Sequence, residues 1–249
     1  MAGRFKGGDG MSVTDAHVSE PFHASQVMTR NAYATAFPNS ECPLRAGDWI
    51  NGFSDGTLWN NIRTTPGLAF GTQVNAGAAF KDGLAHLDGT WFNDQTATAI
   101  CVSNNRITSG DSTLGIVEEV EILLRFSIQQ GNATGYEITF SMDPNASAGK
   151  YVQLNRWNGA LGSFTLLASK TGVTINNGST LFASIVGTVV TVKVDGVSVG
   201  TPFPYDTTAD TPKYASGAPG IGHYYFNSNS VGTYAGSDFG LSSFSVTAA

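Results

Sequence analysis

The sequence predicts an all-β chain, folded as a two-sheet antiparallel β-sandwich behind an extended N-terminal arm. Among its 249 residues are 30 Gly, 15 Phe and 8 Tyr, and aromatic residues favour strands while Gly favours turns. Only 13% of the residues are charged, about half the usual share, whereas surface helices rely on charged side chains. Apolar and polar residues also alternate over long stretches, which indicates strands with one buried face.

Two segments of different character divide the chain. Residues 1–32 are predicted to be an arm or linker, and residues 33–249 the sandwich. The arm begins with a Gly-rich run, contains His17 and His23 and shows no alternation of apolar and polar residues. One short helix is expected over residues 22–30. A docking segment and an unstructured terminus fit this pattern about equally well. Its first residues lack the apolar centre of a signal peptide, so we expect a removed signal or release without one, as virion proteins are released by lysis.

Strands are predicted throughout the second segment, at the spacing typical of a sandwich. The Asp195-Gly196 pair between two alternating runs is a strong hairpin signal. The predicted strands are a weak one at Trp49, a weak one at 69–73, and clear ones at 96–102, 120–126, 136–142, 151–157, 163–169, 181–186, 189–194, 197–199, 223–226 and 239–246.

The two longest alternating runs form a hairpin whose register follows from its apolar residues. Pairing Phe126 with Tyr136 keeps the apolar residues of both runs on one face, whereas a slip of one residue would split them between two faces. The same register sets Arg125 directly across from Glu137 on the opposite face.

The third run, residues 151–157, is expected to pair beside the second. Keeping its apolar residues with theirs places Asn155 beside Glu137 and Gln153 beside Thr139. Three neighbouring strands then present one polar face, made of Glu121, Arg125, Glu137, Thr139, Gln153, Asn155 and, at its edge, Trp157.

This polar face is the candidate ligand site. Sugar-binding sites combine an aromatic platform with planar polar side chains that hydrogen-bond hydroxyl groups. The predicted ligand-binding residues are therefore Arg125, Glu137, Gln153, Asn155 and Trp157. The alternative is structural: a simple cross-strand ion pair between Arg125 and Glu137, with Trp157 packed over the sheet edge.

A series of short segments carries a family likeness when taken in order. They are residues 93–99, 124–126, 135–138, 154–159, 192–196, 217–222 and the closing pair Asp238-Phe239. Their order resembles the concanavalin A-like lectin/glucanase superfamily, particularly the laminin-G-like modules of bacterial and phage proteins. The resemblance covers residues 33–249 and implies a jelly-roll sandwich. It also implies a structural Ca²⁺ with Asp238 as a ligand, in keeping with the preference of Ca²⁺ for oxygen donors.

The superfamily includes glycan-cleaving enzymes, so the sequence was compared with their signatures. Retaining glucanases of this fold carry Glu-x-Asp-x-x-Glu on one strand, because two carboxyl groups must flank the bond. The nearest segment, Glu118-Glu119-Val120-Glu121, lacks the Asp and the final Glu. None of the four histidines stands in the Gln-x-His pattern of alginate-lyase-like members, and His223 is expected at a sheet edge or in a loop. These absences predict that the chain is not an enzyme.

Charge and cysteine content limit the remaining choices. The net charge is −6 and basic residues are scattered, which argues against nucleic acid, and no apolar stretch approaches the length that would insert into a membrane. Cys42 and Cys101 are expected to be free thiols, with a disulfide between them as the alternative.

The predicted function is a non-catalytic glycan-binding or surface-attachment module of a phage virion, as a capsid decoration, spike or fibre component. The arm would dock it to other virion proteins or to copies of itself. The sandwich would face a glycan or host-surface polysaccharide, at the virion surface or outside the cell. The alternatives are a polysaccharide-cleaving glycoside hydrolase or lyase, and a free bacterial carbohydrate-binding module.

Overall fold

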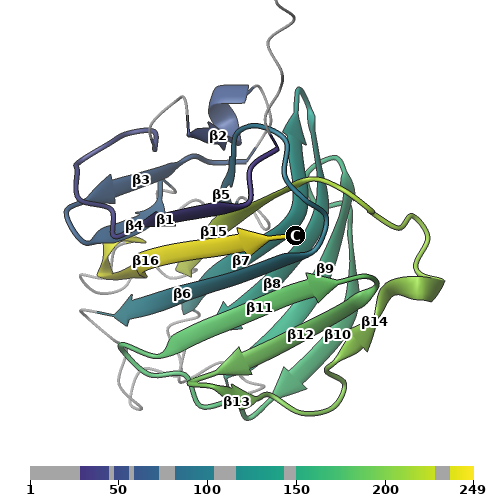
Figure 1. Ribbon diagram of the computed structural model, residues 1–249. Helices are drawn as coiled ribbons and strands as arrows, with labels where there is room; N and C mark the ends of the chain where they lie inside the picture. The colour runs from purple at the N-terminus through teal and green to yellow at the C-terminus, as the bar shows by residue number, and fades with distance from the viewer. Residues whose placement is uncertain are drawn as a thin grey trace, which may run out of the picture.

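Two antiparallel sheets pack face to face as the sequence predicts (Figure 1). The computed structural model describes residues 29–44, 48–55, 59–72, 82–103, 116–142, 150–227 and 236–249. Within these residues one sheet has nine strands and the other seven. The helical structure described is limited to three 3₁₀ turns, at Phe53–Asp55, Thr207–Ala209 and Gly236–Asp238. None of the described helices is long and apolar enough to cross a membrane.

The nine-stranded sheet contains the strands nearest both ends of the described chain. Its strands are β1 (Ala32–Thr35), β3 (Ile62–Thr65), β4 (Leu68–Gly71), β6 (Gln95–Ser103), β11 (Thr180–Val186), β12 (Val189–Val194), β13 (Val197–Ser198), β14 (Tyr205–Asp206) and β16 (Phe239–Ala248). Their order is β13-β12-β11-β6-β16-β4-β3, with β1 paired to β16 and β14 to β12. Ala32, assigned to the arm from sequence, therefore already belongs to the sandwich.

The seven-stranded sheet carries the strands with the strongest alternation. Its strands are β2 (Trp49–Asn51), β5 (Gly83–Leu87), β7 (Ile116–Gln129), β8 (Asn132–Ser141), β9 (Tyr151–Gly159), β10 (Phe164–Thr171) and β15 (Ala218–Asn227). Their order is β10-β9-β8-β7-β15-β5-β2. The strand predicted at residues 223–226 is part of the longer β15. His223 was expected at a sheet edge or in a loop, but β15 lies inside the sheet, between β7 and β5. His223 is buried and stacks on Phe239 at 4.2 Å between ring centroids.

The main core fills the space between the two sheets. Alternate residues of each strand enter it, as a period of two requires. Small side chains of β6 and larger ones of β7 and β8 share this core. Neither cysteine forms a disulfide: Cys101 is buried in the core and Cys42 is exposed. Core residues from these strands include Ala97, Ala99, Cys101, Val120, Ile122, Leu124, Tyr136, Ile138 and Phe140.

A second apolar cluster covers the face of the seven-stranded sheet that points away from the main core, which we call the outer face. Trp59, from the connection between β2 and β3, packs edge-on against Trp157 of β9 at 5.2 Å between ring centroids. The sheet is therefore buried on both sides here. The cluster consists of Trp59, Leu84, Leu123, Phe126, Ile128, Ala133 and Trp157.

The register of the β7–β8 hairpin differs by two residues from the prediction. Leu124, not Phe126, pairs with Tyr136, so the apolar residues before this point still share one face. A β-bulge then separates Leu124 from Ser127, and within it Arg125 has a φ of 47°. Because an extra residue reverses the alternation, Phe126 is buried in the outer cluster instead of the main core.

The bulge also overturns the prediction that Arg125 lies opposite Glu137, whose partner across the hairpin is Leu123. Arg125 instead turns to the rim of the sandwich, where its guanidinium bonds to Asn93 O at 2.7 Å and to Gly187 O at 2.8 Å. It also forms an ion pair with Asp94 at 3.3 Å. The side chain is 5% exposed. Arg125 therefore ties the β7 bulge to the end of the other sheet.

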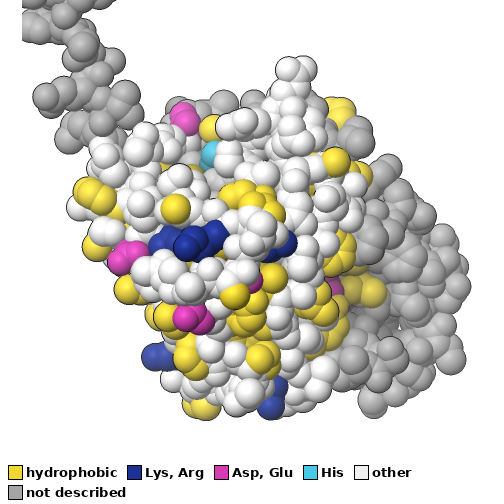
Figure 2. Space-filling model, turned by 90° about the vertical axis from the view of Figure 1, so that its right-hand side faces the viewer, with side chains coloured by type: hydrophobic (Ala, Val, Ile, Leu, Met, Phe, Trp, Pro, Cys, Tyr) yellow, Lys and Arg dark blue, Asp and Glu magenta, His cyan; other side chains and the backbone are white. Residues whose placement is uncertain are grey.

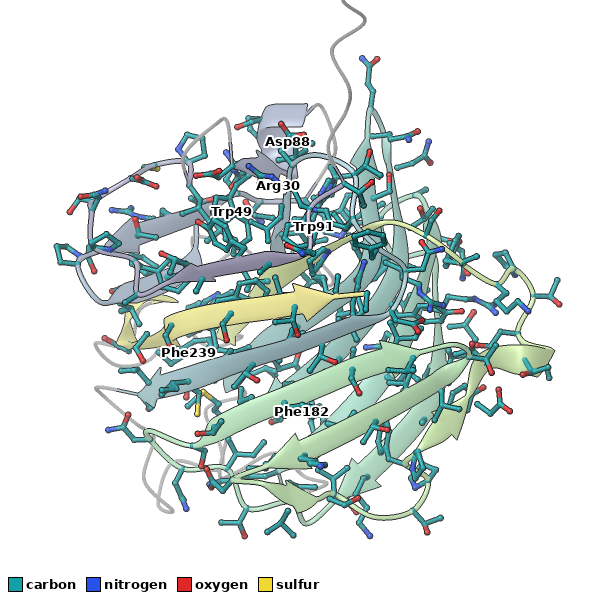
Figure 3. All side chains as sticks on the ribbon, viewed as in Figure 1. Arg30, Trp49, Asp88, Trp91, Phe182 and Phe239 are labelled. Carbon is teal, nitrogen blue, oxygen red and sulfur yellow. The ribbon has the colours of Figure 1, made fainter. Side chains whose placement is uncertain are left out.

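The described chain enters the sandwich beside β1. Arg30 bonds to Asp48 and to the backbone of Asp88, and its backbone forms a parallel bridge with Trp91. Figure 3 shows Arg30, Asp88, Trp91 and Trp49 grouped at this corner, with Trp49 and Trp91 both buried. Figure 2 shows that charged side chains are sparse on the face drawn there, as the composition predicts.

Replacing Arg125 with Met is expected to lower the free energy of unfolding by about 2–4 kcal/mol, because the buried guanidinium group ties together the carbonyl groups of Asn93 and Gly187 and the carboxylate of Asp94. Chemical denaturation followed by tryptophan fluorescence measures this loss. The matched control is Arg63→Met, since Arg63 is exposed and only lies over the Phe70 ring, and it should cost less than about 1 kcal/mol. Equal losses in the two variants would contradict the role assigned to Arg125.

Candidate functional site

The predicted polar face is present on the outer face of β7, β8 and β9. Asn155 pairs with Glu137 and Gln153 pairs with Thr139, as the sequence predicts. Glu121 of β7 pairs with Thr139 from the other side. Three strands thus bring these side chains together next to the outer apolar cluster.

Glu137 is held by three hydrogen-bond donors. Trp157 Nε1 donates to its Oε2 at 2.5 Å, while Asn155 Nδ2 and Thr139 Oγ1 each donate to Oε1 at 3.0 Å. The side chain is 3% exposed. Burial raises the pKa of Glu137, and the three hydrogen bonds act in the opposite direction because they favour the ionised form.

Glu121 lies in a different environment, two residues before Leu123 of the outer cluster. It is 1% exposed, and its Oε2 has no hydrogen-bond partner in the described structure. Burial raises the pKa of Glu121 well above its ordinary value, and the negative charges of Glu137, Asp82 and Glu119 raise it further.

Gly222 of β15 provides the space that Glu121 occupies. A Cβ atom at Gly222 would lie 1.9 Å from Glu121 Oε2. Glu121 therefore lies directly over the neighbouring strand, and any side chain at position 222 would displace its carboxyl group.

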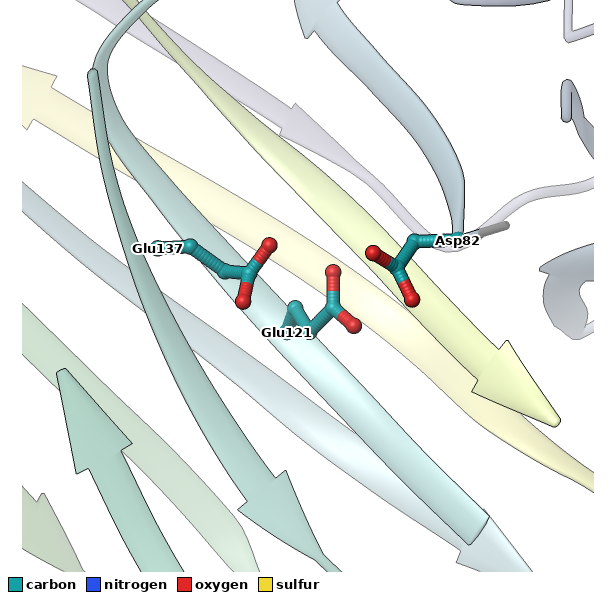
Figure 4. Close-up of side chains that lie close together, drawn as sticks. All are labelled: Asp82, Glu121 and Glu137. Carbon is teal, nitrogen blue, oxygen red and sulfur yellow. The ribbon is translucent and has the colours of Figure 1, made fainter. Parts of the chain in front are cut away.

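Asp82 completes a group of three acids (Figure 4). It lies just before β5 and is 6% exposed. One carboxylate oxygen each of Asp82, Glu121 and Glu137 lies within 4.8 Å of the other two. Burial raises the pKa of Asp82 well above its ordinary value, with added contributions from Glu137 and Glu119.

This spacing also meets the geometric requirement of a hard divalent cation, which prefers carboxylate oxygens. In the described part of the chain no other group of three His, Cys, Asp or Glu side chains meets it. Asp238, the predicted Ca²⁺ ligand, lies in the 3₁₀ turn before β16 and outside this group. Calcium binding at Asp238 stays a prediction.

A cavity of about 230 Å³ opens over the acids. Its apolar wall includes Trp157 and Phe164, whose rings lie 5.3 Å apart, and Tyr151 donates a hydrogen bond to Glu119 at its side. The described lining residues are Asp82, Val117, Glu119, Glu121, Glu137, Thr139, Tyr151, Gln153, Asn155, Trp157, Phe164 and Tyr224.

Of the five predicted ligand-binding residues, Glu137, Gln153, Asn155 and Trp157 line this cavity and Arg125 does not. Trp157 differs in role from the prediction, because its indole is 2% exposed and its N–H is taken by Glu137. It is a wall of the site rather than an open stacking platform at the sheet edge.

Sequence reasoning missed Asp82 and the Tyr151–Glu119 pair. Alternation along residues 117–121 and 151–155 places Glu119 and Tyr151 on the outer face, so the sequence pattern could have added both residues to the predicted site. Asp82 had none, since it comes from a segment without a clear strand pattern.

Comparison with known proteins supports the fold. No protein-family model and no curated protein matches the chain. Among solved structures, similar ones include a β-glucanase of Bacillus licheniformis, with 16% identity over 89% of this chain and 100% of that one and a TM-score of 0.50. Another, from work on endo-acting O-glycanases of the human gut microbiota, has 12% identity over 87% and 98%, with a TM-score of 0.54. The Crh5 transglycosylase has 12% identity over 89% and 85%, with a TM-score of 0.50.

The chain therefore has the concanavalin A-like lectin/glucanase fold that the sequence suggested. The prediction that it is not an enzyme is contradicted, since a glucanase and a transglycosylase stand among its structural neighbours. That prediction required the acids to lie on one strand. In the structure Glu121, Glu137 and Asp82 come from β7, β8 and the segment before β5.

Replacing Glu121 with Gln is expected to stabilise the protein near pH 7–8. A carboxyl whose pKa is raised on folding contributes stability only at low pH, and this contribution is lost as the pH rises through the folded pKa. The variant should therefore melt at a higher temperature than the unmodified protein at pH 7–8, and the difference should shrink towards pH 4. Calorimetry across this range measures it, with Asp88→Asn at an exposed carboxyl as the control. A difference independent of pH would contradict the raised pKa of Glu121.

Proposed function

We propose that this chain cleaves glycosidic bonds in a polysaccharide, with Glu121 as the general acid and Glu137 as the nucleophile. One observation carries the proposal. Two buried carboxyl groups lie side by side, with oxygens within 4.8 Å; three hydrogen-bond donors hold Glu137, whereas Glu121 Oε2 has no partner in the described structure. Pairs of this kind divide acid and base roles between two like residues.

Glu137 is the group suited to remain ionised. Its three donors stabilise negative charge on both oxygens, and they hold the carboxylate in one orientation. A fixed carboxylate can attack an anomeric carbon and form a glycosyl–enzyme intermediate.

Glu121 is the group suited to hold a proton. Its burial and its three acidic neighbours disfavour the charged form, so in its protonated form it can donate a proton to the oxygen of the leaving sugar. Once that proton has left, the Glu121 carboxylate can take a proton from the water that hydrolyses the intermediate.

The spacing of the acids favours retention of configuration. Retaining enzymes place the two carboxyl groups about 5–5.5 Å apart, whereas inverting enzymes need about 6.5–9.5 Å to admit a water between them. Oxygens of Glu121 and Glu137 within 4.8 Å of each other are nearer to the spacing of retaining enzymes. Gln153 and Asn155 line the same cavity and supply the planar amide groups that bind sugar hydroxyls.

Replacing Glu121 with Gln should lower kcat on a cleaved polysaccharide by about 10²–10⁴-fold, the usual contribution of a general acid. A panel of polysaccharides with a reducing-sugar readout measures it. Activity should also persist to higher pH than an ordinary Glu would allow before it falls on the alkaline side, because Glu121 must be protonated to act as the acid and its pKa is raised.

A 2-deoxy-2-fluoro glycoside should label Glu137, as detected by peptide mass spectrometry. Asp88→Asn, at an exposed carboxyl, should leave kcat unchanged. If no member of the panel is cleaved, or if Glu121→Gln is as active as the unmodified chain, the proposed function fails.

Attachment to a virion surface is a separate proposal, based on the Gly-rich character of residues 1–32. Residues 1–28 lie outside the described residues, and the short helix predicted within 22–30 falls largely among them. In support of a detachable arm, Tyr33 is the one described residue before Phe37 that packs on the main core, and it is only partly buried there. The binding partners would be other virion proteins or further copies of this chain.

Removing residues 1–28 should leave the melting temperature unchanged, because the main core and β1 remain intact. The shortened protein should no longer associate with particles in co-sedimentation, whereas the full chain does. A shortened chain that unfolds, or that still sediments with particles, would exclude this role for the arm.

A further inference from the structure

Asp82 is a buried carboxyl that the proposed reaction does not use. Its position is fixed by the backbone, since Asn60 N–H donates to Asp82 O at 2.8 Å and Leu84 N–H donates to Asn60 O at 3.0 Å. The carboxyl is turned towards Glu121 (Figure 4). A carboxyl that is 6% exposed is costly to ionise unless a positive group accompanies it.

The described part of the chain supplies no such group. The cavity lining includes four acids, Asp82, Glu119, Glu121 and Glu137, and none of the described lining residues is Lys, Arg or His. The two salt bridges of the described residues, Arg30–Asp48 and Arg125–Asp94, lie elsewhere. Within the described residues no cationic side chain lies against Asp82, Glu121 and Glu137, and a cationic ligand would balance the charge of these three acids.

Two further atoms indicate what the ligand must offer. Asn155 donates its amide N–H to Glu137, but its Oδ1 has no partner, although the side chain is only 6% exposed. Glu121 Oε2 is likewise buried without a partner. A buried acceptor such as Asn155 Oδ1 costs stability until a donor reaches it. The ligand must therefore bring hydrogen-bond donors as well as positive charge.

We propose that the sugar unit held in this cavity is an amino sugar with a free amine, whose ammonium group pairs with Asp82. This inference rests on the proposed function, and names its substrate class. An ammonium group carries three donors and no acceptor, so it meets both requirements. A uronate or sulfated unit would place a further negative charge among the acids, and a neutral unit would supply donors without balancing charge.

The size of the cavity fits one unit of a longer glycan. Its volume of about 230 Å³ is below the about 300–1,000 Å³ of pockets that enclose a whole drug-sized ligand. The rest of the glycan would lie outside the acid group, beyond Gln153 and Phe164, which also line the cavity.

Three trisaccharides with the same β-1,4-linked backbone test the proposal, because they differ only at C2. One carries hydroxyl groups, one N-acetylamino groups and one free amines. Isothermal titration calorimetry at pH 6 with the full chain should give an affinity about 10–100-fold higher for the amine form, the range for one hydrogen-bonded charge. Added salt should weaken this preference.

Asp82→Asn removes the charge and keeps the shape of the side chain. It should abolish the amine preference and leave the affinity for the hydroxyl form unchanged, while Asp88→Asn, an exposed carboxyl, should change neither. Equal affinities for the three sugars, absence of binding, or a preference that survives Asp82→Asn would overturn the proposal. Displacement of the amine form by equimolar Ca²⁺ would also overturn it, in favour of a cation site.

Binding and cleavage separate the two proposals. An amine preference lost in Asp82→Asn, without cleavage of any polysaccharide, would support the amine site and reject the enzymatic function. Cleavage of neutral polysaccharides by a chain that shows no amine preference would support the enzymatic function and reject the amine site.

Discussion

The seven-stranded sheet must bury both of its faces, and this constraint organises the whole molecule. Along β7, neighbouring residues alternate between the main core and the outer face. Glu121 and Leu123 point outwards because Ile122 points inwards. The bulge at Arg125 then shifts the alternation by one residue, so that the rest of β7 continues to feed the outer apolar cluster. Acids and apolar side chains thereby share one face of one sheet.

The nearness of the apolar cluster gives the acids their unusual chemistry. Trp157 belongs to both groups, since its ring packs against Trp59 while its N–H binds Glu137. A wall of this kind excludes water from one side of the carboxyl groups, and charge in such surroundings is disfavoured. The burial that raises the pKa of Glu121 is thus a consequence of how the sheet is covered. It costs stability at the place where the proposed reaction needs a protonated acid, and such costs are common at functional sites.

The sequence predicts local features of this site and fails where distant segments meet. The β8–β9 register follows from alternation alone because neither strand is interrupted there. The β7–β8 register does not follow from alternation, because the β-bulge places Arg125 at a positive φ. Non-glycine residues rarely adopt such a φ, so the sequence gives no sign of the bulge. In the folded chain Gly217, distant in sequence, packs against the Arg125 backbone so closely that a Cβ would lie 2.3 Å from its carbonyl carbon.

The same limit explains the errors about Trp157, Asp82 and catalysis. Trp157 was expected at an edge, but β10 lies beyond it and Phe164 covers its ring. Asp82 reaches Glu121 only because β5 pairs with β15, which in turn pairs with β7. A signature confined to one strand cannot represent acids that three separate elements bring together.

Two like acids at this distance cannot both be ionised without cost, so their protons belong to the pair. What divides the charge between them is the set of donors around each. Glu137 faces β9, which offers Asn155 and Trp157. Glu121 faces β15, where Gly222 leaves room for the carboxyl but offers no side-chain donor. The strand on one side therefore stabilises a charge, and the strand on the other only makes space. This asymmetry of neighbouring strands, rather than the identity of the acids, makes Glu137 the better of the two at holding a negative charge.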